Sequence, residues 1–404
     1  MISPKPVGDF EPLVRERIRA AIAYRERFVK DTNAYRVIFS EGDFLPGLIV
    51  DRYNDILSLQ VLTQAMDSDP MRDALLSELE DALKPATIFE RVDPRVRKLE
   101  QLPEKESGLI WENAGVVSKA FRAEEPVSEI RAGFAGRPDG EAGSSPLERF
   151  GMTLGERDST GETSGAARAQ SDLAGQGRTA LHRLRTETPV TPRTQAEFHM
   201  NGVRFLYDAL GGQKTGAFLD QRENYAAAAQ YARGEALDAF CYQGGFALHL
   251  ARACEKVTGV DSSRPALEAA EQNASLNGRE IEWIEANAFD LLRDYSDAGR
   301  KFDTIVLDPP AFAKSRQNRD TALRGYKELN LRALKMMRPA GTLVTCSCSY
   351  HVSAVDLLEV LSSAAQDSHR IVRILESRGA AKDHPIVLGV PETAYLKCVI
   401  ALVN

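Results

Sequence analysis

The sequence predicts an α/β protein built around a mainly parallel, seven-stranded sheet, which follows a small α+β domain and a β-hairpin. Three observations lead to this prediction. From residue 236 onward, short apolar segments alternate with segments of helical spacing. Before residue 120, three strand-like segments separated by turn residues precede a helix and a further strand. Between these regions, Asn201-Gly202 joins two alternating segments, a pattern typical of a tight hairpin turn.

Length and composition favour a soluble protein with two or three domains. The chain has 404 residues and a formal net charge of -7, which argues against a surface coated in nucleic acid. It contains no apolar run of about 20 residues, and its N-terminus lacks the apolar core of a signal peptide, so we expect a cytoplasmic location without membrane contact. Its 5 cysteines show no C-x-x-C spacing, so neither a disulfide framework nor a metal site is predicted.

Residues 1–120 are predicted to form the small α+β domain. The interleaved apolar and charged residues at 11–30 indicate an amphipathic helix. AYRVIFS, LIVDRY and ILSLQVL are the predicted strands, followed by a helix over 71–83 and a strand in ATIFERVD. The cluster formed by Arg91, Arg95, Arg97 and Lys98 is compatible with phosphate contact or with an ordinary solvated loop.

Residues 121–194 are predicted to be a flexible linker. Gly, Ser, Pro, Arg, Glu and Ala dominate this stretch, and branched apolar residues are almost absent, so it cannot bury a core of its own. The remaining domain, residues 195–404, begins with the hairpin. Its seven predicted strands cover 236–241, 256–261, 281–285, 302–308, 341–348, 370–376 and 395–403. Helices are expected to begin near residues 245, 264, 288, 321 and 353.

The segment KFDTIVLDPPAF at 301–312 ends a buried strand with an acid and two prolines. Pro309 and Pro310 cannot continue the sheet, so Asp308 is expected at the carboxyl end of the strand, where α/β sheets bind ligands. A carboxylate beside proline rings and Phe312 suits a planar nitrogen heterocycle, whose N–H groups the acid can accept. By itself the motif is also compatible with an ordinary strand end.

The first three strands of the sheet also end in residues suited to a ligand. Gly244 and Gly245 open a helix after the first strand, where missing side chains allow close approach to the backbone. Asp261 ends the second strand, where an acid can accept both hydroxyls of a ribose. Asn287 and Phe289 follow the third strand and could contact an adenine edge and face. Together they predict a cofactor that contains a nucleoside, and the absence of a lysine-serine phosphate loop disfavours a triphosphate.

Taken together, these features resemble those of class I S-adenosylmethionine (SAM)-dependent methyltransferases. Among these enzymes, the sequence most resembles the large-subunit ribosomal RNA cytosine-C5 methyltransferase I family. The resemblance covers residues 11–110 and 195–404. Its motifs, in chain order, are FLPGLIVDRY, GQKTGAFLDQR, CYQGGF, VDSSRPALEAAEQNASLN, LDPPAF, RGYKELN, TCSCS and DHPIVLGVPETAYLK. The sequence departs from the family in three respects: the N-terminal PUA domain has no counterpart, residues 121–194 exceed the family's connector, and Asn287 replaces the usual acid.

The resemblance implies a Rossmann-like methyltransferase sheet, SAM as cofactor, and RNA, expected to be ribosomal, as partner; a homodimer is also expected. The expected cofactor-binding residues are Asp220, Gln221, Arg222, Cys241, Tyr242, Gly244, Gly245, Asp261, Ser262, Asn287, Ala288 and Asp308. The expected substrate-binding residues are Pro309, Pro310, Phe312, Lys314, Arg316 and Arg324. Asp308 is also expected to orient the target base, and no metal is expected.

Two cysteines near the end of the fifth strand are candidates for covalent catalysis. Cytosine C5 is a poor nucleophile until a thiolate adds to C6 and converts the ring into an enamine. Cys346 and Cys348 are two residues apart and are therefore predicted on one strand face. Cys348 lies nearer the tip and matches the family's nucleophile, with Cys346 as the alternative. We expect Lys314, or the helix beginning near Ser353, to lower the nucleophile's pKa.

Residues 314–338 contain eight basic residues and two acids, Asp320 and Glu328. Because this stretch follows the base-binding tip, it is the predicted path of the RNA backbone. Two alternatives to cytosine-C5 methylation stay open. One is methylation of a nitrogen, at guanine N7 or an exocyclic amine, by direct transfer without a covalent step. The other is an RNA-associated protein that binds the cofactor without turnover.

Overall fold

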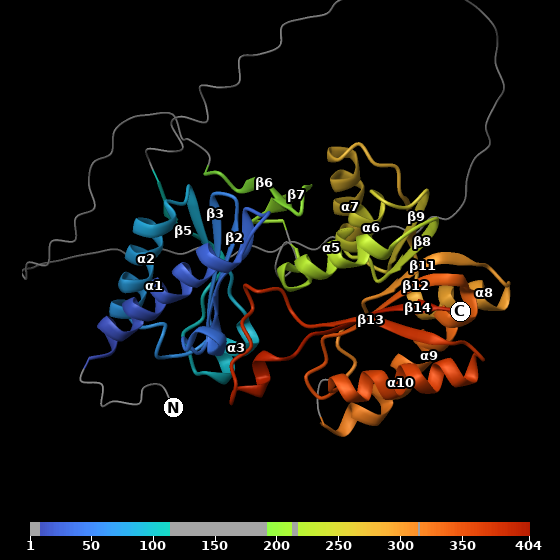
Figure 1. Cartoon of the computed structure of the whole chain (residues 1–404). Helices are drawn as coiled ribbons and strands as arrows, with labels where there is room; N and C mark the ends of the chain where they lie inside the picture. The colour runs from blue at the N-terminus through green and yellow to red at the C-terminus, as the bar shows by residue number, and fades with distance from the viewer. Residues whose placement is uncertain (1–8, 114–191, 212–216, 314–315) are drawn as a thin grey trace, which may run out of the picture. The chain divides into compact units, whose positions relative to one another are not determined.

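The structure is a computed structural model that describes residues 9–113, 192–211, 217–313 and 316–404. Most of the predicted linker, and Lys314 with it, lies outside the described residues. Figure 1 shows the helices and strands under the labels used below. Among the described residues, no helix is both long enough and apolar enough to span a membrane.

The N-terminal part contains a five-stranded sheet in the order β1-β2-β3-β4-β5. The predicted helix and strands are present here, while α3 and β5 were not predicted. The strands are β1 (Ala34–Phe39), β2 (Leu48–Tyr53), β3 (Ile56–Val61), β4 (Thr87–Glu90) and β5 (Gly108–Glu112). The helices are α1 (Phe10–Phe28), α2 (Asp69–Leu83) and α3 (Pro94–Leu99).

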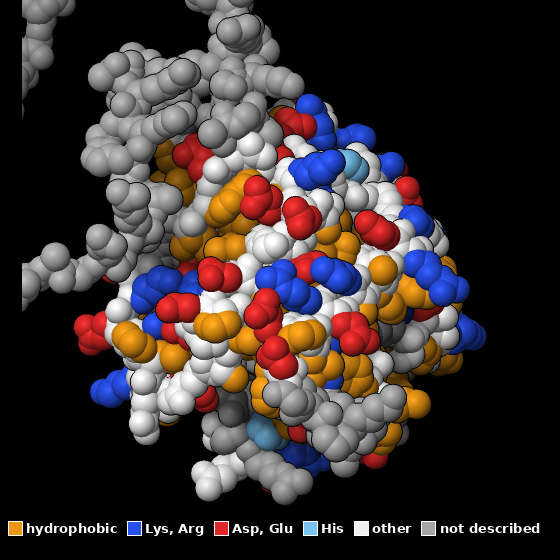
Figure 2. Space-filling view, turned by 90° about the vertical axis from the view of Figure 1, so that its left-hand side faces the viewer, with side chains coloured by type: hydrophobic (Ala, Val, Ile, Leu, Met, Phe, Trp, Pro, Cys, Tyr) orange, Lys and Arg blue, Asp and Glu red, His pale blue; other side chains and the backbone are white. Residues whose placement is uncertain are grey.

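Helices α1 and α2 each bury an apolar face and carry charged residues on the other side. Their apolar residues pack with the strands, among them the fully buried Ile18 and Leu79. On the charged side, Glu78 of α2 pairs with Arg15 at 3.2 Å and with Arg19 at 2.7 Å, both from α1. Figure 2 shows acidic and basic side chains intermixed over this side of the molecule. The two arginines are partly exposed to solvent, whereas Glu78 itself is buried.

The predicted hairpin is formed by β6 (Gln195–Met200) and β7 (Val203–Asp208). Asn201 and Gly202 both have positive φ, 53° and 75°, as a two-residue hairpin turn requires. The inward-facing aromatic residues of the hairpin join a core with both larger sheets; the Tyr207 ring stacks on Tyr53 with centroids 3.9 Å apart.

The C-terminal part contains the predicted seven-stranded sheet, in the order β10-β9-β8-β11-β12-β14-β13. Six strands run in the same direction, and β14 runs antiparallel to both of its neighbours, β12 and β13. The strands are β8 (Glu235–Ala239), β9 (Lys256–Asp261), β10 (Glu282–Glu285), β11 (Phe302–Leu307), β12 (Met337–Ser347), β13 (Val372–Arg378) and β14 (Lys397–Val403).

Helices cover both faces of this sheet (Figure 1). One apolar core contains residues of α5 (Arg222–Tyr231), α6 (Gly245–Leu250) and α7 (Arg264–Leu276). A second core contains residues of α8 (Ala288–Asp297), α9 (Arg319–Met336) and α10 (Ala354–Asp367). The strand order reverses between β8 and β11, so the carboxyl ends of these strands border the crevice where doubly wound sheets bind ligands.

Two predicted strand boundaries near the site were wrong. Strand β12 ends at Ser347, so Cys348 lies just beyond the strand instead of on one strand face with Cys346. Strand β14 begins at Lys397, which leaves Tyr395 in the preceding loop. Helix α5 was not predicted, because its run of alanines and polar residues has weak apolar periodicity.

Candidate active site

A cavity of 690 Å³ opens at the carboxyl edge of β8, β9, β11 and β12. Its wall combines three acids with several aromatic rings. Most of the residues predicted for the cofactor and the target base lie in it. Those residues are Asp220, Gln221, Tyr242, Asp261, Ser262, Asn287, Ala288, Asp308, Pro309, Pro310, Phe312 and Cys348.

Asp308 follows β11 directly, as predicted, and faces this cavity. Its Oδ1 accepts a hydrogen bond of 2.9 Å from Nε2 of Gln221. Burial, together with the nearby Asp220 carboxylate, raises the pKa of the Asp308 carboxyl to about 7. The group can therefore exchange a proton near neutral pH.

The η2 turn (Leu219–Gln221) places Asp220 and Gln221 beside Asp308. The Oε1 atom of Gln221 accepts a hydrogen bond of 2.7 Å from Nδ2 of Asn224, which fixes the amide so that its N–H group points to Asp308. On the other side, the Tyr395 hydroxyl donates to Oδ2 of Asp220 at 2.6 Å. These contacts hold two carboxylates in one cavity, an arrangement that favours a positively charged ligand.

The glycine turn after β8 borders the cavity. Cys241 and Gly245 line a small adjoining space of 20 Å³ that shares Tyr242 and Asp308 with the larger cavity. A Cβ atom on Gly245 would lie 2.5 Å from the Tyr225 ring, and one on Gly244 would lie 2.9 Å from Trp283. Packing within the protein therefore requires both glycines, and their contact with a cofactor stays a prediction.

The tips of β9 and β10 contribute the residues predicted to contact a nucleoside. The Asp261 carboxylate accepts backbone N–H groups of Tyr242 and Ser263, each at 2.9 Å, which fixes its orientation at the cavity wall. Asn287 caps α8 by accepting the N–H of Phe289 at 2.9 Å. The Phe289 ring in turn meets Phe240 edge to face at 6.0 Å.

Cys348 and Cys346 occupy different environments. Cys348 lines the cavity, where its thiol lies 4.0 Å from the carbonyl oxygen of Pro309. Cys346 is fully buried in β12 opposite Cys398 of β14 and belongs to the apolar core. The geometry thus offers one of the two candidate thiols to a ligand in the cavity.

The protonation state of Cys348 differs from the expected one. Burial, together with the Asp308 and Asp220 carboxylates, raises the pKa of its thiol to about 12. The sequence predicted that the helix beginning near Ser353 would lower this pKa. In the structure, the Ser353 and Asp356 side chains form a capping box at the start of α10, so they already occupy N–H groups of that helix end. Without a ligand, the site therefore keeps Cys348 as a neutral thiol.

Some predicted site residues lie elsewhere. Arg222 is buried and donates to Oδ2 of Asp383 at 2.8 Å, away from the cavity wall. Arg324 is exposed on α9 and donates to the Thr321 hydroxyl. Lys314 lies outside the described residues, and nothing is described for the side chain of Arg316.

Among the described residues of the basic stretch at 314–338, Arg319, Lys327, Arg332 and Arg338 form ion pairs with acids. Arg319 pairs with Asp356 at 2.5 Å, and Lys327 pairs with Asp367 at 2.7 Å. Further ion pairs join Arg332 to Asp297 and Glu328, and Arg338 to Asp303 and Glu235. The predicted phosphate path is therefore less positive than the sequence count suggested. In the N-terminal part, Arg97 likewise pairs with Asp67 at 3.1 Å and is buried.

Sequence reasoning missed Phe218, Phe240, Tyr395 and Leu396 among the residues that line the cavity. It also missed Lys397, whose side chain is buried just behind Cys348. The available signal was the segment TAYLK, which combines an aromatic and a lysine immediately before a strongly apolar strand. No periodicity argument distinguishes such residues from an ordinary strand end.

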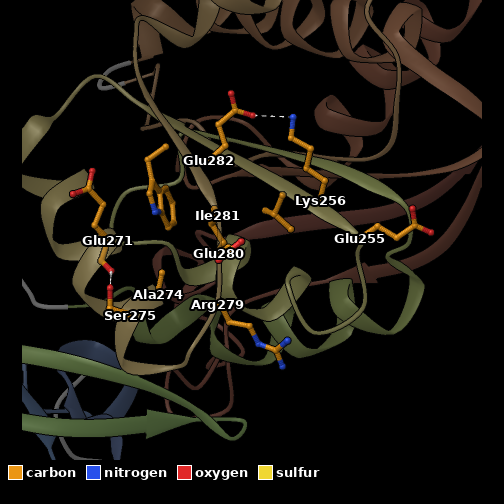
Figure 3. A pocket seen from close by; sticks show the side chains of 11 residues that line it. Glu255, Lys256, Glu271, Ala274, Ser275, Arg279, Glu280, Ile281 and Glu282 are labelled. Atoms are coloured by element: carbon orange, nitrogen blue, oxygen red, sulfur yellow. Dashed lines mark hydrogen bonds and ion pairs between the residues drawn. The ribbon is translucent and has the colours of Figure 1, made fainter.

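A second cavity, of 530 Å³, lies at the amino ends of β9 and β10, opposite the site edge (Figure 3). Its exposed charges partly pair with each other, as Lys256 does with Glu282 at 3.2 Å. None of the predicted site residues lies there. Among the described residues, no group of three or more His, Cys, Asp or Glu side chains could hold a metal ion.

Comparisons with known proteins agree with this architecture. Residues 162–392 match the family described as S-adenosylmethionine-dependent methyltransferase. The chain is 33% identical over 396 residues to ribosomal RNA large subunit methyltransferase I of Tolumonas auensis, covering 96% of this chain and 80% of the relative. It is 31% identical over 389 residues to the protein of the same name from Photobacterium profundum, covering 95% and 78%.

Among solved structures, the chain resembles SMU.776 in complex with SAH, with a TM-score of 0.68 and 15% identity over 100% of this chain and 84% of that one. A SAM-dependent methyltransferase from Streptococcus mutans matches equally well. The fold and the family match together define a SAM-dependent methyltransferase. Within that class, the chain belongs to the family of ribosomal RNA large subunit methyltransferase I.

Proposed function

We propose that this protein methylates C5 of a cytosine in large-subunit ribosomal RNA through a covalent bond between Cys348 and C6 of the base. The observation that carries the proposal is the position of Cys348, whose thiol shares one cavity with Asp308, Pro310 and Phe312. The names of the curated relatives support ribosomal RNA as the substrate. Ribosomal RNA would be met in the cytoplasm, where we place the protein.

The cavity residues fit the cofactor. The Asp261 carboxylate would accept the ribose hydroxyls, while Phe240 and Phe289 present ring faces and edges to an adenine. When bound, the cofactor supplies a methyl group on a positively charged sulfur. Asp308 and Asp220 would favour that charge, because two carboxylates in one cavity repel each other unless a cation lies near them.

The protein's residues have separate tasks in the proposed reaction. The Cys348 thiolate forms a bond to C6, and N3 of the ring gains a proton, for which Asp308 is suited by its pKa of about 7. The resulting enamine carries electron density at C5, which takes the methyl group. The C5 proton then leaves to water and the N3 proton returns to Asp308, which expels the thiolate, breaks the bond to C6 and restores the aromatic ring. The enzyme is regenerated without a net change in its own atoms.

Because the Cys348 thiol is neutral in the empty site, its conversion to the reactive thiolate would depend on ligand binding. Because Asp308 and Asp220 raise the pKa of Cys348, a cation bound beside them would lower it again. The thiolate would then form mainly when the cofactor is present. The same neutral thiol also gives a reason to consider methylation of a ring nitrogen or exocyclic amine, a reaction that needs Asp308 and the aromatic wall but no nucleophile.

The first prediction separates these two reactions. Large-subunit ribosomal RNA transcribed with 5-fluorocytosine should trap the enzyme as a denaturant-stable adduct, because fluorine at C5 cannot leave as a proton. Cys348→Ala should form no adduct and lose nearly all methyl transfer. Cys346→Ala, the matched control in the core, should keep both in large part. Gel electrophoresis and peptide mapping provide the measurement.

An adduct on Cys346 would exchange the roles of the two cysteines and leave the covalent mechanism intact. Methyl transfer that persists in Cys348→Ala, with no adduct on any cysteine, would instead establish nitrogen methylation. Nucleoside mass spectrometry of the product RNA then identifies the modified base directly.

A further inference from the structure

Lys397 is a buried lysine whose ammonium group is anchored to two backbone carbonyls, and it lines a neighbouring cavity of 790 Å³ instead of the cavity of the site. It is the first residue of β14, and 8% of its surface is exposed. Its Nζ atom donates one hydrogen bond of 2.7 Å to the Ser349 carbonyl and another of 2.7 Å to the Tyr395 carbonyl. An ammonium group has three N–H donors, so these two contacts leave one for a further acceptor.

These contacts bring the charge alongside Cys348. The backbone of Lys397 pairs with Ser347 in the β12–β14 ladder, and its side chain reaches forward to Ser349. Cys348 lies between these two residues, in the short turn that the lysine thus spans. The turn is also held from the other side, where the Tyr326 hydroxyl of α9 contacts the Ser349 hydroxyl at 3.0 Å.

We propose that Lys397 is a positioning residue that holds the turn carrying Cys348 and stabilises the thiolate once its proton has left to water. The proposal rests on the proposed function for the role of that thiolate as nucleophile. Asp308 and Asp220 oppose ionisation of Cys348, whereas the ammonium of Lys397 favours it. The two tyrosines that face the turn, Tyr326 and Tyr395, stay neutral, since burial raises the pKa of both.

The lysine can itself lose its charge within a measurable pH range. Burial lowers the pKa of Lys397 to about 8, and the Cys348 thiolate and the Asp356 carboxylate of α10 only partly offset the decrease. If Lys397 acted only through packing, its loss of charge near pH 8 would not change the reactivity of the Cys348 thiol. The dependence of Cys348 reactivity on pH therefore distinguishes an electrostatic role from a packing role.

The test measures the reaction of Cys348 with methyl methanethiosulfonate, in which the thiolate attacks the probe and methanesulfinate leaves. Rates are recorded from pH 7 to 9.5 by peptide mapping, using the full-length protein without RNA. Lys397→Gln removes the charge but keeps an N–H donor for the two carbonyls, and Lys397→Met removes both. Lys397→Arg keeps the charge. Lys256→Gln, at an exposed lysine paired with Glu282, is the matched control.

At pH 7.5, the rate at Cys348 should fall about tenfold in Lys397→Gln, corresponding to about one unit of thiol pKa. It should fall at least as far in Lys397→Met and stay within about threefold of wild type in Lys397→Arg. Above pH 8, wild type and Lys397→Gln should converge, because the wild-type lysine also becomes neutral. Lys256→Gln should match wild type throughout.

Equal rates in wild type and a folded Lys397→Gln variant would overturn the proposal. So would a decrease that stays constant across the pH range, because it would indicate a packing effect. Thermal melting checks that each variant is folded. The outcome is independent of the proposed function: a charge effect without any 5-fluorocytosine adduct would keep Lys397 as the partner of Cys348 while removing cytosine-C5 methylation.

Discussion

Asp308 and Cys348 both hold their protons more tightly than the same groups do in water. Burial is the main cause for each, and the negative charges of the cavity add to it. A positively charged ligand reverses the second contribution without changing the fold. The site can therefore stay unreactive when empty and become reactive when filled, by electrostatics at single residues.

At the same scale, Asp261 provides the second prediction. Asp261→Ala should weaken SAM binding about tenfold or more, since hydrogen bonds to a charged group are typically worth about 1.5 to 3 kcal/mol. Calorimetry measures the affinity. Asp290→Ala, at an exposed acid on the neighbouring α8, is the control and should bind SAM as wild type does. Unchanged affinity in Asp261→Ala would place the ribose elsewhere.

Helices α5 and α6 illustrate how elements position the site. Tyr225 of α5 is fully enclosed, and its ring lies edge to face against Phe246 of α6 with centroids 4.7 Å apart. The first residue of α6, Gly245, leaves the space that the Tyr225 ring occupies. The glycine turn and the turn carrying Asp220 are thus locked together by one aromatic side chain.

The third prediction tests this contact. Gly245→Ala places a Cβ atom 2.5 Å from a buried ring that cannot move freely, so it should destabilise the protein by about 1 to 3 kcal/mol. Gly108→Ala, where no atom lies within 4 Å of the added Cβ, should change stability little. Urea unfolding compares the two. Equal stabilities would show that α5 and α6 can separate without cost.

For the whole molecule, Asp383 joins the N-terminal part to the methyltransferase sheet. It is fully buried, and its Oδ2 accepts the backbone N–H of Arg36 in β1 and a guanidinium N–H of Arg222 in α5, each at 2.8 Å. Its carbonyl oxygen accepts a third bond, of 2.7 Å, from Arg25 of α1. The DHP motif therefore has a structural role shared by three distant elements.

The fourth prediction follows from these contacts and concerns pH. Burial alone would raise the pKa of Asp383, but His384 and Arg222 outweigh it and hold the pKa below its usual value. A depressed pKa stabilises the fold above the unfolded pKa of about 4, and that contribution is lost as the pH falls further. Asp383→Asn should therefore lose about 3 kcal/mol at pH 7 and about 1 kcal/mol less than that at pH 3, because the contribution falls by about 1.4 kcal/mol for each pH unit below the unfolded pKa until the folded carboxyl itself gains a proton.

Urea unfolding at both pH values measures this difference, with Asp290→Asn on the exposed face of α8 as the control. A cost for Asp383→Asn that is as large at pH 3 as at pH 7 would mean that packing, rather than charge, accounts for the stabilisation.

The fifth prediction concerns the long connection between the two sheets. Thr87 of β4 pairs with Glu112 near the end of β5, and its hydroxyl donates to the Arg193 carbonyl at 3.0 Å. Both ends of the connection therefore meet at one residue, so a short connector can close the gap. Replacing residues 121–190 with a Gly/Ser connector should leave SAM affinity unchanged and lower the melting temperature by less than about 5 °C.

A larger decrease in melting temperature, or weaker SAM binding, would show that residues 121–190 contribute to the fold. The homodimer expected from the sequence stays a prediction, which light scattering on the full-length and shortened proteins can check.

The sequence by itself determined the elements that depend on local chemistry. Alternating apolar segments predicted the seven strands, Asn201-Gly202 predicted the hairpin turn, and the prolines after Asp308 predicted the end of a strand, which lies at the cavity. Each of these features follows from backbone preferences and side-chain periodicity within a few residues, so a single sequence reveals it.

Only the tertiary structure decided what each side chain faces. Cys346 and Cys348 differ by two positions, yet the end of β12 at Ser347 leaves one in the core and the other in the cavity. Burial and opposing charges keep the thiol of Cys348 neutral, which spacing could not predict. Lys397 reaches the turn that carries Cys348 through a pairing between distant strands. Such contacts depend on which strands become neighbours, and local sequence does not contain that information.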